Sequence, residues 1–234
     1  MEIHALFDGL AWLTSAYLVV LLRKYFADAF PSSAGARTKG YLIALIVGAG
    51  VGAYGLGTAN LWLAGVAGIA RSIEGALAGA ILGVELYKWR TGMAGRTAAL
   101  FVLPIAMGIA VGRIGCYLAG LEDFTYGVPT TLPWGHDFGD GISRHPVQLY
   151  EAAALTLFAA AYSIALFRRD QWPLGNGFAL FVLFYAAQRF GLEYLKPYPD
   201  LLWGMTIFQV VCVGMVLYAL VLLRPERFFH AQRT

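Results

Sequence analysis

Apolar runs of roughly 20 residues recur along nearly the whole chain, and a helix of that length crosses the hydrocarbon core of a bilayer. They predict seven transmembrane helices, over residues 5–22, 41–63, 73–89, 97–112, 147–167, 175–194 and 203–223. The longest polar segment between them covers residues 121–146. No other gap is long enough for a separate soluble domain, so we expect residues 1–234 to form a single all-α, polytopic membrane domain.

The composition agrees with this pattern. Hydrophobic residues make up 59% of the chain and charged residues only 13%, against about a quarter charged in a soluble domain. The sequence begins Met-Glu-Ile-His-Ala, without the basic region of a cleavable signal peptide, so we expect the first run to be retained as a span. Cys116 and Cys212 do not suggest a disulfide framework. The spacing of the histidines and cysteines predicts no metal site.

Basic residues indicate the orientation. Most of the 17 Lys and Arg residues follow the first, third, fifth and seventh runs, and the positive-inside rule assigns that side to the cytoplasm. The N-terminus is then outside and the C-terminus inside a multi-pass protein of the cell membrane. Because these clusters account for the net charge of +3, we expect no nucleic-acid partner. They are Arg23, Lys24, Arg37, Lys39, Lys88, Arg90, Arg96, Arg168, Arg169, Arg224, Arg227 and Arg233.

The remaining basic residues oppose this rule, because they lie at or near the outer ends of the spans. Ionisable groups in or beside membrane spans are candidate functional residues. This set consists of Arg71, Arg113, Arg144, Arg189 and Lys196.

The third run combines small and acidic residues. Gly75, Gly79 and Gly83 recur every four residues, which predicts a stripe that a neighbouring helix approaches closely. Glu74 and Glu85 are eleven residues apart, close to three helical turns, and therefore share a face. A carboxylate facing lipid is costly, so we expect Glu74 to face an interior cavity and Glu85 to pair with a nearby basic residue.

Polar residues become dense around the outer segment 121–146, where prolines and glycines predict turns. For Arg113 and Arg189 two interpretations are open. They form ion pairs with Asp123, Glu151 or Glu193, as intramembrane charges usually do, or their forked donors clamp the phosphate of a phospholipid headgroup. His145 is either a general base or a loop-capping donor.

Several strings in these segments resemble the prolipoprotein diacylglyceryl transferase family. They are GRIGCYLAG, a following YG, LPWG, RHPVQLYEA and RFGLEYLKPYPDLLWGMT. The resemblance implies a seven-span fold with the N-terminus outside. It also implies transfer of a diacylglyceryl group from phosphatidylglycerol to the lipobox cysteine thiol of a prolipoprotein, with glycerol phosphate as leaving group. No cofactor is implied, because the phospholipid itself brings the leaving group.

The same resemblance implies roles for individual residues. Arg113 and Arg189 would hold the donor phosphate and stabilise charge on the leaving group, and Glu151 and Glu193 would orient those arginines. The other substrate-binding candidates are Cys116, Gly120, Asp123, Tyr126, Arg144, His145, Gln148 and Tyr150.

The sequence departs from the family at three positions. Cys116 stands where the family usually has Asn, Glu74 where it has the His of a His-Gly-Gly segment, and Asp8 where its first span carries Tyr. Because an acceptor thiol has a pKa near 8.5, a base assists the reaction. A desolvated Glu74 or Asp8, with its pKa raised by burial, is our hypothesis for that base.

Two alternatives stay open. The departures and the short outer segment allow a diverged transferase with another acceptor, such as a different thiol, an alcohol or a second lipid. A non-catalytic lipid-binding or transport protein would use the same arginines for a headgroup and the carboxylates for a polar path. Convergence of Asp8, Glu74 and both arginines on one outer cavity favours catalysis, whereas acids continuing to the inner face favour transport.

Overall fold

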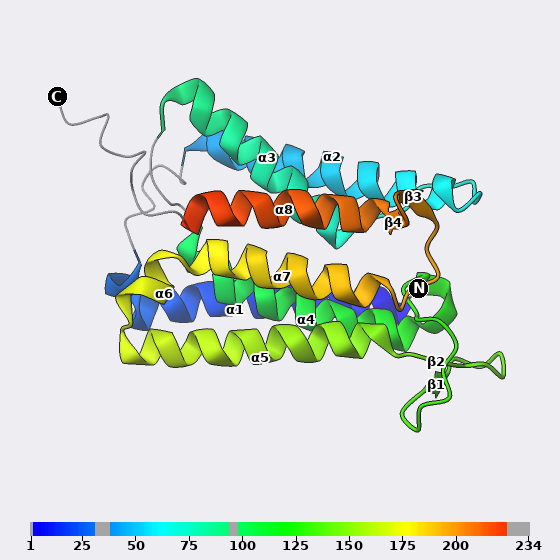
Figure 1. The fold of residues 1–234 in the computed structure, drawn as a ribbon. Helices are drawn as coiled ribbons and strands as arrows, with labels where there is room; N and C mark the ends of the chain where they lie inside the picture. Colours follow the sequence, from blue (N-terminus) through cyan, green and yellow to red (C-terminus); the bar gives the residue numbers. More distant parts are fainter. Residues whose placement is uncertain (1, 31–37, 94–97, 224–234) are drawn as a thin grey trace.

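In a computed structural model, which describes residues 2–30, 38–93 and 98–223, the chain forms an elongated helical bundle (Figure 1). The long helices within the described residues coincide with the runs predicted from the sequence. They are α1 (Glu2–Tyr25), α2 (Lys39–Leu63), α3 (Ile73–Thr91), α4 (Val102–Ala119), α5 (Val147–Arg168), α7 (Gly177–Glu193) and α8 (Ile207–Leu223). Short helices fill some connections: η1 (Ala27–Ala29), η3 (Ala99–Phe101), η4 (Gly120–Asp123) and α6 (Gln171–Gly175).

Among the described residues, four helical segments are long and apolar enough to cross a membrane. They are Ile3–Tyr25, Lys39–Leu63, Ala99–Asp123 and Val147–Arg168, and α8 is a shorter apolar helix. The chain is thus an all-helical, multi-pass membrane protein, as its sequence predicts.

The helices pack in neighbouring pairs. Helix α2 lies against α3, α1 against α4, α4 against α5, and α7 against α8. In Figure 1 the α2–α3 pair lies along one side of the bundle, and α8 separates it from α7. The apolar core is formed mainly by α4, α5 and α7, where Val102, Leu155 and Phe181 are completely buried.

Glycines bring α2 and α3 into backbone contact. A Cβ at Gly52 would clash with the carbonyl oxygen of Gly75, and a Cβ at Gly79 would clash with that of Gly48. Gly83 is equally close to the backbone of Ala44. The close approach predicted from the glycine spacing of the third run is therefore present.

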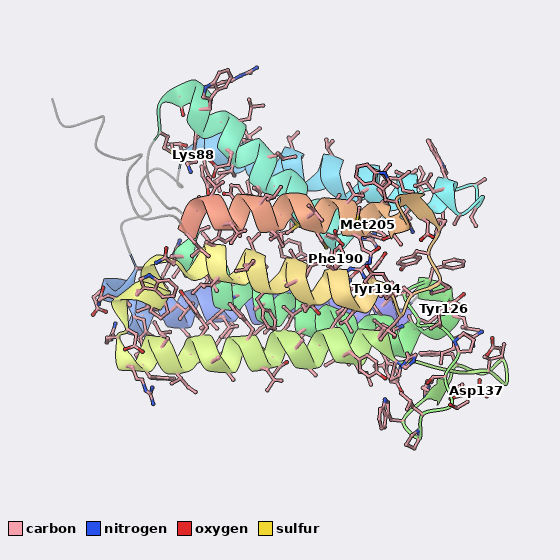
Figure 2. The ribbon with its side chains drawn as sticks, viewed as in Figure 1. Lys88, Tyr126, Asp137, Phe190, Tyr194 and Met205 are labelled. Carbon is pink, nitrogen blue, oxygen red and sulfur yellow. The ribbon has the colours of Figure 1, made fainter. Side chains whose placement is uncertain are left out.

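Two small hairpins and the N-terminus lie at the same end of the bundle (Figure 1). Strands β1 (His136–Asp137) and β2 (Ser143–Arg144) pair antiparallel, with His136 opposite Arg144. Strands β3 (Asp200–Leu202) and β4 (Met205–Thr206) form the second hairpin, with Asp200 opposite Thr206. Figure 2 shows Tyr126 and Asp137 at this end and Lys88 at the opposite end. We call it the hairpin end.

The predicted end of the fourth run at residue 112 is wrong, because α4 continues to Ala119. Gly115 permits this continuation, since any Cβ there would clash with Phe7 of the adjacent α1. The helix ends at Gly120, whose φ of +67° suits a residue without a side chain. Consequently Arg113 and Cys116 lie on a helix rather than beyond its end.

The predicted start of the seventh run is also wrong. Helix α8 begins at Ile207, and Trp203 lies between β3 and β4 with a φ of +52°. Trp203 and Gly204 form the turn of that hairpin, and the Trp203 side chain is 87% exposed. An apolar residue beside a run therefore belongs to a turn.

Some residues of the orientation argument are outside the described part of the chain: Arg37, Arg96, Arg224, Arg227 and Arg233, together with residue 97 at the predicted start of the fourth run. Within it, Lys88 and Arg90 lie in the last turn of α3, and Arg168 lies in the last turn of α5. The sidedness of the bundle stays a prediction.

Candidate active site

A cavity of about 430 Å³ lies at the hairpin end of the bundle and has a markedly polar wall. The sequence candidates on this wall come from several helices and from the connection after α4. They are Asp8, Glu74, Arg113, Cys116, Asp123 and Arg189, with Arg71 and Lys196 beside them.

Glu74 is positioned by the start of α3. The side chain of Ser72 caps this helix by accepting a hydrogen bond from the backbone N–H of Gly75, at 3.1 Å. Glu74 is therefore in the first turn, where the helix dipole favours an anion. Its side chain is buried, with 1% of the residue exposed, and it lines the cavity as predicted.

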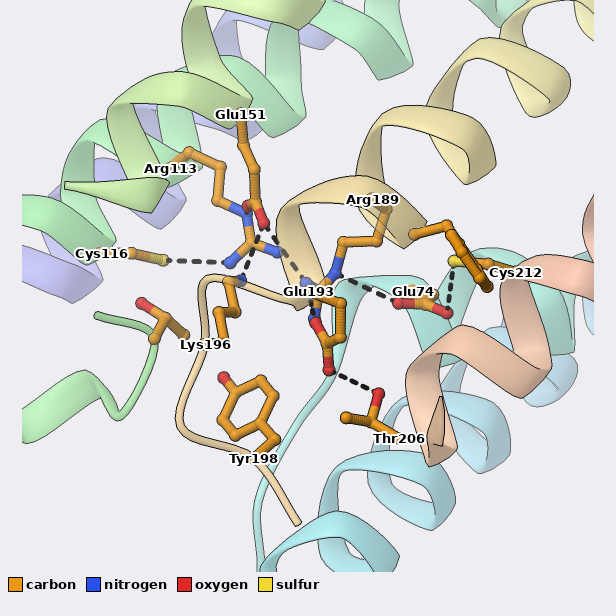
Figure 3. Close-up of polar contacts among 12 residues, drawn as sticks. Glu74, Arg113, Cys116, Glu151, Arg189, Glu193, Lys196, Tyr198, Thr206 and Cys212 are labelled. Carbon is orange, nitrogen blue, oxygen red and sulfur yellow. Dashed lines mark hydrogen bonds and ion pairs between the residues drawn. The ribbon is translucent and has the colours of Figure 1, made fainter. Parts of the chain in front are cut away.

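Arg113 projects from α4 toward α5 and forms an ion pair with Glu151 (Figure 3). Its Nη1 also lies 3.9 Å from Cys116 Sγ. Glu151 accepts a hydrogen bond from Lys196 Nζ at 2.8 Å, so two cations from different elements meet at this carboxylate.

Arg189 of α7 contacts three carboxylates. Its Nε is 3.2 Å from Glu74 Oε2, and its Nη1 is 3.6 Å from Glu151 Oε1. It also pairs with Glu193, one turn along the same helix. With only 3% of Arg189 exposed, these contacts replace its hydration.

The three cations and three acids form one buried, charge-balanced group, which we call the ionic cluster (Figure 3). Its members are Arg113, Arg189, Lys196, Glu74, Glu151 and Glu193, and all are buried. Buried charges are tolerated when they are paired in this way.

Helix α8 and strand β4 hold the acids of the cluster from the other side. Thr206 Oγ1 donates to Glu193 Oε1 at 2.8 Å, and Cys212 Sγ donates to Glu74 Oε1 at 3.3 Å. Gln209 Oε1 accepts from the backbone N–H of Thr206 at 3.0 Å. The carboxylates are thereby fixed in orientation.

Lys196 follows α7 and has no exposed side-chain surface. Burial, followed by repulsion from Arg189, lowers its pKa from 10.5 to about 8, although Glu151 opposes the change. Lys196 is therefore the member of the cluster whose charge changes just above neutral pH.

At the rim of the cavity His4 of α1 lies between two carboxylates. Its Nδ1 is 3.2 Å from Asp8 Oδ2, and its Nε2 is 2.9 Å from Asp123 Oδ1. Cys116 Sγ is 3.8 Å from the same Nε2. Asp8 is also 3.9 Å from Arg71 Nη2. Sequence reasoning missed His4, although its position four residues before Asp8 places both on one face of a helix.

The other candidates of the outer segment do not line this cavity in the described structure. Arg144 donates to both oxygens of Asp140, at 2.6 and 2.7 Å, and stacks over Tyr126. That hydrogen bonding lowers the pKa of Asp140. His145 Nδ1 is 3.3 Å from the hydroxyl of Tyr150, so the histidine has a loop partner, as the capping interpretation expects.

Two further candidates have structural positions. Gly120 ends α4. Gln148 is completely buried in α5, and within the described residues its amide atoms have no hydrogen-bond partner. Nothing in the sequence indicated that Thr206 and Cys212 would contact the ionic cluster, because both lie in or beside an ordinary apolar run.

The acids do not continue through the bundle as a polar path. Glu85 is paired with Lys88 at 3.0 Å and accepts from Tyr218 at 2.9 Å. These two charged residues line a second cavity of about 500 Å³ whose wall is otherwise mostly apolar. The convergence of Asp8, Glu74, Arg113 and Arg189 on the other cavity matches the arrangement expected for catalysis.

Comparison with known proteins adds independent evidence. A family model described as prolipoprotein diacylglyceryl transferase matches residues 16–224. A protein named phosphatidylglycerol–prolipoprotein diacylglyceryl transferase from Nitratidesulfovibrio vulgaris strain DP4 is 35% identical over 177 residues, which are 71% of this chain and 63% of that protein. The protein of that name from Azoarcus sp. strain BH72 is 33% identical over 173 residues, 69% of this chain and 63% of its own length. The matched part of this chain thus spans just under two thirds of these relatives.

Proposed function

Because its residues 16–224 match the family model, the chain belongs to the prolipoprotein diacylglyceryl transferase family, and we propose that it transfers a diacylglyceryl group from phosphatidylglycerol to a thiol. The relatives bear names that state this donor and a prolipoprotein acceptor. The lipobox cysteine of a prolipoprotein is the acceptor that we propose for this chain.

The observation that carries the proposal is the pair of arginines on one cavity wall. Arg113 and Arg189 come from α4 and α7, and each is held by a buried carboxylate on another helix. A guanidinium fixed in this way offers its remaining donors to a phosphate without reorganising. The ion-pair and phosphate-clamp interpretations are thus compatible.

The reaction follows from that placement. The acceptor sulfur attacks the glyceryl carbon that carries the phosphate, a C–S bond forms, and the C–O bond breaks. The electron pair of that bond leaves with glycerol phosphate, whose developing charge lies beside Arg113 and Arg189. The thiol proton passes to a base, for which we propose Glu74 or Asp8, since both line the cavity.

The apolar cavity supports a lipid donor. Trp12 contributes to the walls of both cavities, so the polar and apolar spaces are neighbours. A phospholipid with its headgroup at the arginines would find an apolar surface for its acyl chains nearby. This adjacency favours a lipid over a soluble phosphate ester.

The same proposal includes the topology. We propose seven crossings of the cell membrane, with the hairpin end and the N-terminus outside. Lys88 and Arg90 at the opposite end of α3 then face the cytoplasm. A lipoprotein precursor would reach the cavity from the outer side.

The test uses membranes that contain the full chain and phosphatidylglycerol labelled either in its headgroup or in its acyl chains. We expect release of labelled glycerol phosphate and transfer of the acyl label to a peptide with a lipobox cysteine. Arg113→Ala should lower turnover at least about 100-fold, as loss of a transition-state donor does. Arg90→Ala, an exposed arginine at the opposite end, serves as the matched control.

The acceptor is resolved by a second peptide in which serine replaces the lipobox cysteine. Label on the cysteine peptide alone supports the proposal. Label on an endogenous lipid instead identifies a diverged acceptor, and absence of glycerol phosphate release from wild-type membranes would overturn the transferase function altogether.

A further inference from the structure

Three potential metal ligands from separate elements meet at the rim of the cavity. His4 Nε2 of α1, Cys116 Sγ of α4 and a carboxylate oxygen of Asp123 in η4 all lie within 4.8 Å of one another. The nitrogen is 2.9 Å from Asp123 Oδ1 and 3.8 Å from the sulfur. Ligands about 2.0–2.3 Å from a tetrahedral Zn²⁺ are separated from each other by similar distances.

Contacts behind these ligands hold two of them in the necessary orientation. The Nδ1 of His4 faces Asp8 Oδ2 at 3.2 Å, so the imidazole directs Nε2 toward Cys116 and Asp123. Thr125 Oγ1 donates to Asp123 Oδ2 at 2.5 Å, which leaves Oδ1 directed at His4. A histidine that donates to a carboxylate through its other nitrogen is the usual arrangement around bound zinc.

We propose that His4, Cys116 and Asp123 bind a Zn²⁺ ion whose fourth ligand comes from the cavity. Nitrogen, sulfur and oxygen ligands together suit zinc better than magnesium or calcium, which require oxygen. The thiolate of Cys116 and the carboxylate of Asp123 neutralise the two charges of the ion. All three residues line the cavity, so an arriving ligand reaches the fourth position without unfolding any element.

The chemical use of the site rests on the proposed transferase function. An acceptor thiol at the fourth position loses its proton on coordination, which supplies the nucleophile. The proton passes to Glu74 on the same cavity wall, and the sulfur then forms the C–S bond as glycerol phosphate leaves. Asp8 becomes a positioning residue for His4 rather than the base.

This site is particular to the chain rather than inherited from the matched region. The family model begins at residue 16, so His4 and Asp8 precede it. Cys116 occupies a position where the family usually has Asn. The donor set also crosses 112 residues of sequence between His4 and Cys116, which is why ligand spacing gave no indication of it.

The test begins with metal content. The full chain is purified in detergent with a tag that contains no histidine, without added chelator, and its zinc is measured by plasma mass spectrometry. We expect about one zinc per chain in the wild type and in Cys212→Ser, which alters the other buried cysteine. Cys116→Asn, which places the usual family residue in α4, and His4→Ala should both lose the zinc.

A spectroscopic measurement separates bound metal from adventitious metal. Replacement by Co²⁺ should give a thiolate-to-cobalt charge-transfer band in the wild type and in Cys212→Ser, and the band should be absent from Cys116→Asn. Asp8→Asn should keep the band but weaken cobalt affinity 10–100-fold, as expected when the group orienting a ligand is altered.

The outcomes distinguish this inference from the proposed function. Wild-type protein that releases glycerol phosphate but holds no more zinc than Cys116→Asn overturns the metal site and leaves the transferase standing. A cobalt band that persists in Cys116→Asn also overturns it. Zinc bound through Cys116 in a protein without transfer activity supports the site and contradicts only its use at the acceptor.

Discussion

The α2–α3 pair and the ionic cluster both bring helices close together, but through opposite chemistry. Between α2 and α3 the side chains are absent, and Gly52 and Gly79 let backbone meet backbone. In the ionic cluster, long charged side chains from α3, α4, α5 and α7 meet around Arg189. The first contact works by dispersion alone, and the second requires every charge to have its partner.

The difference concerns how each contact fails. A backbone contact tolerates no added atom, whereas the ionic cluster tolerates no lost charge. The α2–α3 pair is therefore sensitive to enlargement of a side chain and the cluster to truncation of one. Three substitutions test this distinction, in order of decreasing expected effect.

Arg189→Ala should have the largest effect. It leaves Glu74 and Glu193 without their main cation, and removal of one partner from a buried pair costs about 3–5 kcal/mol. Turnover should fall at least about 100-fold. Thermal unfolding in detergent and the lipid-transfer assay measure the two effects. Arg189→Lys keeps the charge but not the fork, so it should remain folded with reduced turnover. A melting temperature of Arg189→Ala equal to that of the wild type would contradict the structural role of the cluster.

Gly52→Ala should have a smaller effect. Its single Cβ would clash with the carbonyl oxygen of Gly75, and overpacking of this kind costs about 1–3 kcal/mol. Gly50→Ala is the matched control two residues away, because a Cβ there meets nothing within 4 Å. Its melting temperature should be equal or slightly higher, since alanine favours the helix. Equal melting temperatures for the two variants would show that α2 and α3 are further apart than described.

Lys196→Met should have the smallest effect, and it depends on pH. The folded chain releases the proton of Lys196 at a pKa of about 8, below the ordinary value of 10.5. Between these values the unfolded state binds the proton more tightly, so this group makes stability rise with pH, by up to about 1.4 kcal/mol per unit. Lys196→Met should lack that rise. Parallel pH profiles of melting temperature for the two proteins would refute the depressed pKa.

The fold was largely predictable because each helix carries its own evidence. Ile73 and Val147 begin helices where the apolar runs begin, and the glycine period of α3 predicted its contact with α2. Helix ends were less predictable. Gly115 continues α4 only because Phe7 of another helix fills the space beside it, and a run contains no information about such a neighbour.

The site was predictable as a set of residues but not as a set of contacts. The family resemblance indicated Arg113, Arg189, Glu151 and Glu193, yet only the packed helices show that Glu74 joins them. His4 carried no motif, and its distance from Asp123 depends on how α1 packs on α4. Local periodicity determines which face of a helix is buried, whereas the pairing of distant charges is determined by tertiary packing.

The balance of charges in the ionic cluster bears on how the protein finishes a turnover. Three cations opposite three acids leave no surplus positive charge to retain an anion. Phosphatidylglycerol arrives with one negative charge, and glycerol phosphate departs as a dianion near neutral pH. The cleaved headgroup is therefore repelled more strongly by Glu74, Glu151 and Glu193 than the intact lipid was, while the lipid is also held by its acyl chains. An electroneutral pocket of this kind binds its donor through the tails and expels its product through the charge.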